Sequence, residues 1–225
     1  MKLRMIIVGA GKTGKHVIRM AIKDKHEVYV IEKNEELAKQ IAADFDCKVI
    51  VEDATSMDTL KEAGAEEADA LVTTTEDDSV NLLVIMQGKE LGIKNLVSSV
   101  ADDGHIPMFE RVGASTVENP HRLNGEHLYR AMRLPTARDF MQLGGDIEMV
   151  EFLVDENADA EGKTIAELEK DETIPESARI IILRREDDVI LPKEDTKIKA
   201  GDVMVVVSKE SVTEKLIKPF KTEEE

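Results

Sequence analysis

The sequence predicts an α/β fold, in which a domain with a parallel sheet is followed by a smaller α+β domain. Short apolar runs alternate with stretches of helical spacing through the first 132 of the 225 residues. A glycine-rich turn, Gly9 to Gly14, directly follows the first apolar run. Later in the chain the pattern changes to short strands with few helices. Strands that alternate with helices are typical of βαβ units, which form parallel sheets.

The first domain, residues 1–132, is expected to contain five strand–helix pairs. Residues 5–8 are purely apolar, which is typical of a strand buried on both faces of a sheet. A helix is predicted next, because apolar residues recur at helical spacing from Val17 to Ile22. Asn34 is a candidate N-cap for the second helix. The same alternation predicts strands at 28–31, 49–51, 71–72 and 96–100, and helices at 35–42, around Leu60, at 80–91 and near Phe109.

The second domain, residues 146–225, is expected after a linker at residues 133–145. An amphipathic helical stretch covers about 123–132, and Pro135 and Gly144-Gly145 then interrupt the pattern. Apolar runs predict short, mostly antiparallel strands at 152–154, 180–183, 189–191 and 203–207. The charged residues 184–188 predict a hairpin turn, and residues 200–202 predict another turn. Residues 222–225 are expected to form a solvated acidic tail.

Charge and composition exclude several classes of protein. The chain carries 47 acidic and 30 basic residues, and its net charge of −17 repels the phosphate backbones of nucleic acids. The excess is uneven, with a net charge of −5 over residues 1–138 and −12 over residues 139–225. No run approaches the roughly 18 apolar residues of a membrane-spanning helix, and no signal peptide is predicted. The single cysteine, Cys47, fits a reducing compartment. We therefore expect a cytoplasmic chain without nucleic-acid binding or direct membrane insertion.

The segment that carries chemistry is Gly9-Ala10-Gly11-Lys12-Thr13-Gly14, which matches G-x-G-x-x-G. It follows a predicted strand and opens a predicted helix, and Glu32 ends the next strand 18 residues after Gly14, as in a Rossmann-like dinucleotide-binding unit. Gly9 permits a tight turn, Gly11 lets the backbone approach a pyrophosphate, and Gly14 lets the helix pack closely. Glu32 is expected to accept hydrogen bonds from a ribose and to favour NAD over NADP.

Two alternatives have to be weighed against this interpretation. Residues 9–16 also match the phosphate-loop pattern G-x-x-x-x-G-K-[ST], except that His16 stands where a hydroxyl would hold Mg²⁺, so nucleotide hydrolysis is not favoured. An NAD-dependent oxidoreductase would need a proton donor and a substrate site in the second domain, which offers no candidate set. The five histidines have no ligand spacing and form no cluster with Cys47. No catalytic residue and no metal site are therefore predicted.

Several further motifs accompany the glycine turn in the order found in one family. The chain resembles the N-terminal nucleotide-binding domain of the TrkA/RCK family over residues 1 to about 132. The resemblance rests on residues 9–14, Glu32, and the segments 53–55, 60–64, 68–70, 75–78 and 81–83. From about residue 139 onward, segments 161–165 and 200–207 are similar to the C-terminal regulatory domain of the same family.

The resemblance implies a nucleotide, NAD(H) or ATP/ADP, at the carboxyl edge of the sheet. The residues implied in its binding are those of the glycine turn, the ends of the second to fifth strands and the positions that follow them: Gly9, Ala10, Gly11, Lys12, Thr13, Gly14, Glu32, Glu52, Asp53, Ala54, Thr74, Thr75, Glu76 and Ser99. Lys12 and Thr13 would lie by the phosphates, Glu52 to Ala54 near the adenosine, and Thr74 to Glu76 near the second half of a dinucleotide. Lys12 and Ser99 stand where relatives often have arginine, which affects the preference among adenine nucleotides.

The resemblance also implies a function. Members of this family regulate potassium transporters and channels, so the chain is expected to be a cytoplasmic, nucleotide-sensing subunit that gates such a membrane partner, lies peripheral to the membrane and is not an enzyme. A homo-oligomer, either a dimer or a ring, is expected as well. The helical stretch 123–132 with Leu134 and Met141 is a candidate apolar face for a second subunit.

Overall fold

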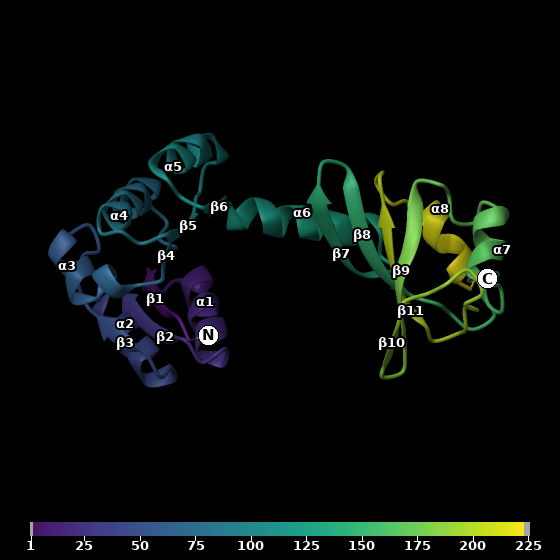
Figure 1. Ribbon diagram of the computed structural model, residues 1–225, viewed down its shortest axis with the longest axis horizontal. Coiled ribbons are helices and arrows are strands. Elements are labelled where there is room, and N and C mark those ends of the chain that lie inside the picture. The colour runs from purple at the N-terminus through teal and green to yellow at the C-terminus, as the bar shows by residue number, and fades with distance from the viewer. Residues whose placement is uncertain (1, 223–225) are drawn as a thin grey trace. The chain divides into compact units, whose positions relative to one another are not determined.

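The computed structural model describes residues 2–222 and consists of two compact units, Met1–Asn124 and Gly125–Glu225 (Figure 1). The acidic tail expected at 222–225 falls, from residue 223 onward, outside the described residues. The boundary between the units falls within helix α6, Pro120–Arg133. No helix among the described residues is long and apolar enough to cross a bilayer.

The first unit is built on a six-stranded, fully parallel sheet with the order β3-β2-β1-β4-β5-β6. This arrangement confirms the predicted parallel α/β fold. The five predicted strands are present, together with β6, which the sequence pattern missed because its three residues include no buried side chain. The strands are β1 Arg4–Val8, β2 Glu27–Ile31, β3 Lys48–Ile50, β4 Ala70–Thr73, β5 Asn95–Ser99 and β6 Thr116–Glu118.

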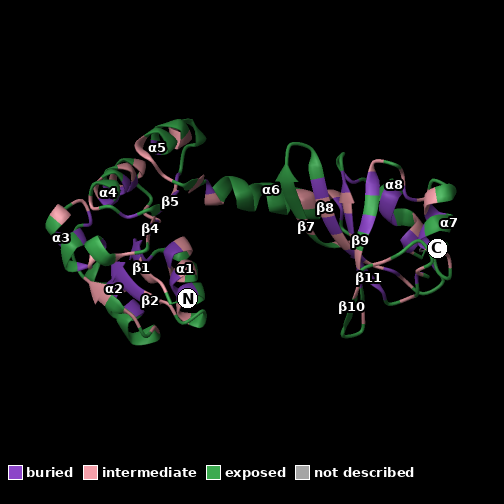
Figure 2. Ribbon diagram, in the orientation of Figure 1, coloured by how far each residue is buried: buried purple, intermediate pink, exposed green. Residues whose placement is uncertain are grey.

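Five helices cover the two faces of this sheet, which explains the unbroken apolar runs. Ile7 packs with one cluster that includes side chains of the first two helices, while its neighbours Ile6 and Val8 pack with the cluster that includes the other three. Figure 2 colours much of β1 and β2 as buried and large parts of the surrounding helices as exposed. Successive strand residues point to opposite faces, so a strand covered on both sides has no polar position to spare. The helices are α1 Lys12–Lys23, α2 Glu35–Asp44, α3 Met57–Glu62, α4 Asp78–Glu90 and α5 Ile106–Val112.

The second unit is an antiparallel five-stranded sheet with the order β10-β9-β11-β8-β7, and two short helices pack with it. The predicted small α+β domain is therefore confirmed, as is the hairpin at residues 180–191. The elements are β7 Ala137–Gly144, β8 Ile147–Leu153, α7 Ile165–Lys170, β9 Ala178–Arg185, β10 Asp188–Ile190, β11 Val203–Ser208 and α8 Glu214–Ile217.

Strand β7 lies where the sequence analysis places a linker, residues 133–145. Its side chains are mostly exposed, so it lacks the alternation of apolar and polar residues from which strands are recognised. Of the two glycines that we interpreted as interruptions of structure, Gly144 ends β7 and Gly145 begins the two-residue turn to β8, with positive φ angles of 115° and 58°. The glycines thus connect two strands of one sheet.

A buried ion pair holds the turn before β11 in the second unit. Asp202 is fully buried and accepts hydrogen bonds from Nε and Nη2 of Arg185 at 2.7 and 2.8 Å and from the Lys199 amide at 2.9 Å. These contacts tie the predicted turn at 200–202 to the neighbouring strand β9. A carboxylate away from water is stable only with such partners.

We expect Asp202→Ala to lower the free energy of unfolding of the second unit by about 3 kcal/mol, the lower end of the cost of breaking a buried ion pair, because Arg185 remains partly exposed. Urea denaturation would measure the change. Asp195→Ala, at an exposed position of the same unit, is the matched control and should change stability by less than about 0.5 kcal/mol. Equal effects of the two substitutions would contradict the structural role of Asp202.

Candidate functional site

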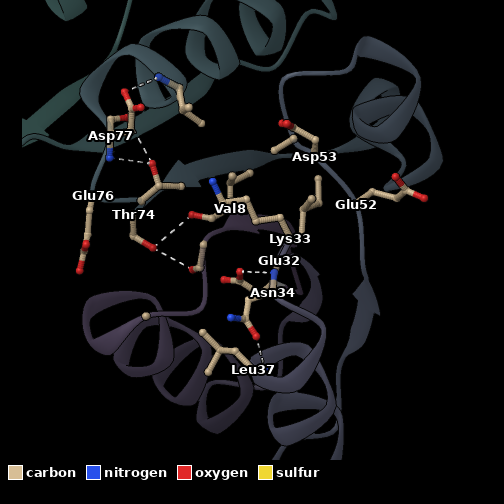
Figure 3. A pocket seen from close by; sticks show the side chains of 16 residues that line it. Val8, Glu32, Lys33, Asn34, Leu37, Glu52, Asp53, Thr74, Glu76 and Asp77 are labelled. Carbon is tan, nitrogen blue, oxygen red and sulfur yellow. Dashed lines mark hydrogen bonds between the residues drawn. The ribbon is translucent and has the colours of Figure 1, made fainter.

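A cavity of about 460 Å³ opens at the carboxyl ends of β1, β2 and β4 in the first unit (Figure 3). The chain leaves β1 for β2 on one side and β4 lies on the other, so the strand order reverses at this point. Open α/β sheets bind ligands in the crevice at such a reversal. The cavity is lined by Val8, Gly9, Gly11, Ile31, Glu32, Lys33, Asn34, Leu37, Glu52, Asp53, Ala54, Thr74, Thr75, Glu76, Asp77 and Val80.

The glycine turn forms the floor between β1 and α1. Gly9 has a φ of 86°, and its amide donates to the Ile31 carbonyl at 2.9 Å. A Cβ on Gly14 would clash with the Gly9 carbonyl oxygen and would lie 2.7 Å from Oγ1 of Thr74. The roles predicted for these two glycines, a tight turn and a close approach, are therefore confirmed. At Gly11 the protein itself does not require a glycine, because a Cβ there would meet no atom within 4 Å. The approach of its backbone to a pyrophosphate stays a prediction.

Helix α1 starts without a capping side chain. Gly11 is its N-cap residue and has no side chain to accept from the first amides of the helix. The unpaired amides and the helix dipole both favour an anion at this end. Because α2 and α4 are capped by the side chains of Asn34 and Asp77, α1 differs from the two other long helices around the cavity.

Glu32 braces the glycine turn from the end of β2. Its side chain is buried, with Oε2 accepting from the Ala10 amide and Oε1 from the Asn34 amide, both at 2.8 Å. Each carboxylate oxygen keeps a further lone pair, so these bonds leave capacity for a ligand hydroxyl. The ribose contact expected of Glu32 stays a prediction. Its bond to the Ala10 amide was not predicted, because it depends on the conformation of a loop 22 residues earlier.

Thr74 and Asn81 fix the β4 side of the cavity. Oγ1 of Thr74 donates to the Gly9 carbonyl at 2.9 Å, which links the end of β4 to the glycine turn. Asn81 is fully buried in α4; its Oδ1 accepts from Oγ1 of Thr75 at 2.7 Å and its Nδ2 donates to the carbonyls of Thr75 and Ser99 at 2.9 and 3.2 Å. Asn81 is a supporting residue: it lies in the segment 81–83 that carries the family resemblance, but it was not predicted as a site residue, since a polar residue on a helix usually indicates a solvated face.

Glu52 and Asp53 lie on the opposite side of the cavity, beyond β3. The backbone amide and the hydroxyl of Thr55 donate to Asp53 at 2.9 and 2.8 Å and lower the pKa of Asp53. This carboxylate is therefore ionised at neutral pH. Figure 3 shows Glu52 and Asp53 across the cavity from Glu76 and Thr74.

Of the predicted site residues, nine line the cavity: Gly9, Gly11, Glu32, Glu52, Asp53, Ala54, Thr74, Thr75 and Glu76. Five others do not: Ala10, Lys12, Thr13, Gly14 and Ser99. Lys12, Thr13 and Gly14 form the first turn of α1, and Ser99 ends β5 with its carbonyl bonded to Asn81. Among the lining residues that were not predicted, Lys33 and Asp77 are charged. Each directly follows a predicted site residue, Glu32 or Glu76, and this adjacency in the sequence is the signal from which they could have been predicted.

A second ion pair lies at the start of α4, next to the cavity residue Asp77. Nδ1 of His105 is 2.7 Å from Oδ2 of Asp78, and the Ala101 amide donates to the same carboxylate at 2.8 Å. The hydrogen bond to Asp78 raises the pKa of His105, although partial burial opposes the shift. For Asp78, burial acts to raise the pKa, but the hydrogen bonds outweigh it and the pKa is lowered.

The second unit contains a larger cavity, of about 860 Å³, lined by residues of the segments 169–177 and 208–219. It has no counterpart of the glycine turn, and α8 beside it is only four residues long. Neither unit holds, among the described residues, a group of three or more His, Cys, Asp or Glu side chains that could bind a metal ion. The cavity of the first unit is therefore the better candidate.

Comparison with known proteins agrees with this division of the chain. A family model described as TrkA-N domain matches residues 5–120, and one described as TrkA-C domain matches residues 149–221. The chain is 31% identical over 219 residues to a Trk system potassium uptake protein TrkA homolog of Archaeoglobus fulgidus, covering 95% of this chain and 49% of the relative. A homolog of the same name from Methanothermobacter thermautotrophicus is 28% identical over 212 residues, covering 93% and 96%. The chain thus spans about half of the first relative and nearly all of the second.

Solved structures with a similar fold include two of the GsuK protein. A structure of the GsuK channel bound to NAD has a TM-score of 0.65 and 18% identity, covering all of this chain and 41% of that one. A structure of GsuK bound to ADP has a TM-score of 0.52 and 18% identity, covering 60% and 35%. At these identities the likeness supports the fold.

We expect Gly14→Ala to destabilise the first unit by about 3 kcal/mol, because its Cβ would overlap backbone that cannot move without displacing β1. Gly11→Ala is the matched control in the same turn; its Cβ enters open space, so the cost should be at most about 1 kcal/mol, which reflects the preference of an N-cap position for glycine over alanine. Urea unfolding of both variants would measure the difference. Similar costs for the two would contradict the close approach at Gly14.

The His105 pair predicts a pH dependence of stability. A pKa that is raised in the folded state means that protonated His105 stabilises the fold; this contribution is complete below the unfolded pKa of about 6.5 and is lost as pH rises through the folded value. His105→Asn keeps a donor but cannot titrate, so the wild type should exceed this variant in urea midpoint by more at pH 5.5 than at pH 8.5. A difference that is constant or grows with pH would refute the assignment.

Proposed function

The chain belongs to the TrkA family, and on that premise we propose that it is a nucleotide-sensing regulatory subunit of a membrane potassium transporter or channel. The observation that carries the proposal is the braced glycine turn, which presents the uncapped start of α1 to a cavity at the carboxyl edge of the sheet. This arrangement is suited to the phosphates of a nucleotide. The relatives named as potassium uptake proteins support the transport role.

The proposed ligand is an adenine nucleotide, NAD(H) or ATP/ADP. The cavity has room for a nucleotide, since its volume of about 460 Å³ is within the usual range of ligand sites. Glu32 would accept from ribose hydroxyls with its remaining lone pairs, and Glu52, Asp53 and Ala54 would border the adenosine. The two GsuK structures are of that protein bound to NAD and bound to ADP.

We propose binding rather than catalysis at this site. The cavity lining includes no histidine, cysteine or tyrosine among the described residues, and three of its carboxylates, Glu32, Asp53 and Asp77, already accept backbone hydrogen bonds, so it presents no arranged acid–base pair for hydride transfer. His16 still stands where a phosphate loop would need a hydroxyl for Mg²⁺. No observation favours the oxidoreductase alternative.

Signalling would follow from the loops that the nucleotide bridges. A ligand that contacts the glycine turn and the β4 end joins elements that Thr74 and Asn81 already connect to β5 and α4. Binding therefore favours conformations in which these contacts are closed, and a membrane partner that prefers one conformation would respond. The chain would act at the cytoplasmic side, peripheral to the membrane through this partner.

We further propose that the chain forms a homo-oligomer through α6 and β7. The large apolar side chains exposed there are Leu123, Leu128, Tyr129, Met132, Met141 and Leu143, with Met132 82% exposed. Leu134, which the sequence analysis assigned to the same face, is instead buried in the core of the second unit. It follows the end of α6, so helical spacing did not apply to it.

We expect at least one of NAD, NADH, ATP and ADP to bind below millimolar concentration in calorimetry, because α1 supplies donors and a dipole for the phosphates. Gly11→Asp should abolish binding, since its carboxylate would occupy the anion position. Gly125→Asp, which adds the same charge at an exposed helical glycine with free space around it, is the control. The proposal fails if the unmodified chain binds none of the four nucleotides.

Light scattering at micromolar concentration should give at least the mass of a dimer, with or without nucleotide. Met132→Glu should shift the population toward monomer by placing a charge on the apolar surface. The control is Leu191→Glu, at a position 75% exposed that follows the edge strand β10. A monomeric wild type, or dissociation by both substitutions alike, would overturn the proposed interface.

A further inference from the structure

Helix α1 carries an excess of positive charge in an otherwise acidic chain. Residues 1–23 include six lysines and arginines and no aspartate or glutamate, whereas the whole chain has 47 acidic and 30 basic residues. Along α1 the side chains of Lys12, His16, Arg19 and Lys23 are exposed and recur every three or four residues. Side chains with this spacing lie on one face of a helix, so these four form a basic stripe about 16 Å long.

The lysines and the arginine of the basic stripe have no partner in the part of the chain that the structure describes. Within residues 2–222 they make no hydrogen bond or ion pair, whereas Lys15, which lies outside the stripe, pairs with Asp44 at 2.8 Å. Met20, next to Arg19, is 55% exposed. The stripe therefore offers unpaired cations and an apolar side chain to another molecule.

The complementary surface in the same chain is the tip of the hairpin between β9 and β10. Glu186, Asp187 and Asp188 are consecutive and exposed, and their carboxylates make no hydrogen bond or ion pair within residues 2–222. The two arginines that precede them are already engaged in ion pairs with Glu151 and Asp202, at 2.9 and 2.7 Å. The negative charge of the tip is therefore uncompensated.

The hairpin tip is also accessible. Strand β10 is an edge strand of the second sheet, and Figure 1 shows the hairpin projecting beyond the other strands of that sheet. Val189, which follows the acidic residues, is 68% exposed and is an apolar counterpart for Met20. Surfaces of opposite charge attract and orient each other as two molecules meet.

We infer that the basic stripe of α1 binds the acidic hairpin tip of a second copy of this chain. The two surfaces differ, so the contact is heterologous: each copy has one of each and can contact two others, and such contacts close into a ring where the rotation between copies allows. The contact uses neither α6 nor β7. It would therefore join the dimers proposed above into larger assemblies, and its failure would leave that dimer interface unaffected.

An anionic bilayer is a poorer match to the basic stripe. The chain carries a net charge of −17, and α2, which packs on the same face of the sheet as α1, exposes Glu36. Asp24, directly after the end of α1, is exposed as well. A flat anionic surface would meet these carboxylates together with the stripe and be repelled by them. A narrow hairpin tip meets the stripe alone.

Carbodiimide cross-linking of the full chain tests the contact, because this reagent joins a carboxylate directly to a lysine amine that touches it. In an equal mixture of nitrogen-15-labelled and unlabelled chains, we expect linked peptides that contain Lys23 from one isotope and residues 186–188 from the other. Arg19→Glu should lower the yield about threefold or more, since it replaces an attraction by a repulsion. Salt at 1 M should lower the yield as well, because exposed charges are then screened.

Lys61→Glu is the matched control, since it reverses a charge at an exposed position of another helix of the first unit, α3. It should leave the yield at the wild-type value. The inference is wrong if the link is absent, if it forms only within chains of one isotope, or if Lys61→Glu lowers it as much as Arg19→Glu does.

Exchange of charge between the two surfaces gives a second test. One variant carries Arg19→Glu and Lys23→Glu, and the other carries Asp187→Lys and Asp188→Lys. In light scattering each alone should have a lower mass than wild type at the same micromolar concentration, and an equal mixture should regain the wild-type mass, because each reversed surface then meets its complement. Equal masses throughout, or no recovery on mixing, would overturn the inference. So would sedimentation with phosphatidylglycerol vesicles that Arg19→Glu abolishes, if the cross-link is absent.

Discussion

The hydrogen bond between the Glu32 carboxylate and the Ala10 amide is the contact on which the site depends. It joins the end of β2 to the turn after β1, while Thr74 joins the same turn to the end of β4. Three strand ends are thereby held in one geometry before any ligand arrives. The absence of a side chain at Gly14 lets α1 approach this turn, and the first amides of the helix are left facing the cavity. A site prepared in this way has little conformational entropy left to lose on binding.

Electrostatics in this site work in two directions. The start of α1 favours an anion, and the surrounding carboxylates oppose one. A ligand that carries its negative charge at the pyrophosphate and little elsewhere satisfies both conditions. In the proposed nucleotide site, this balance would favour a dinucleotide over a triphosphate.

The sequence predicted the strands and helices that bury apolar side chains, because burial on both faces of a sheet leaves unbroken apolar runs such as residues 5–8. It also predicted the roles of Gly9 and Gly14, since few residues other than glycine fit a positive φ or a contact with backbone. What it could not predict depends on tertiary contacts between distant segments. The hydrogen bonds of Asn81 and the bond between Glu32 and the Ala10 amide are examples, because the partners lie in segments whose conformation no local pattern encodes. Strand β7 was missed because an exposed strand leaves no apolar alternation.

Hydrogen–deuterium exchange of the full chain, with and without saturating NAD⁺, tests most directly whether the braced glycine turn is the binding site. The account predicts that slowed exchange is concentrated in peptides covering residues 9–14, 32–34, 52–54 and 74–77, with the largest change at the uncapped start of α1. Unchanged exchange in these peptides, together with protection of residues 169–177 and 208–219 around the cavity of the second unit, would contradict it.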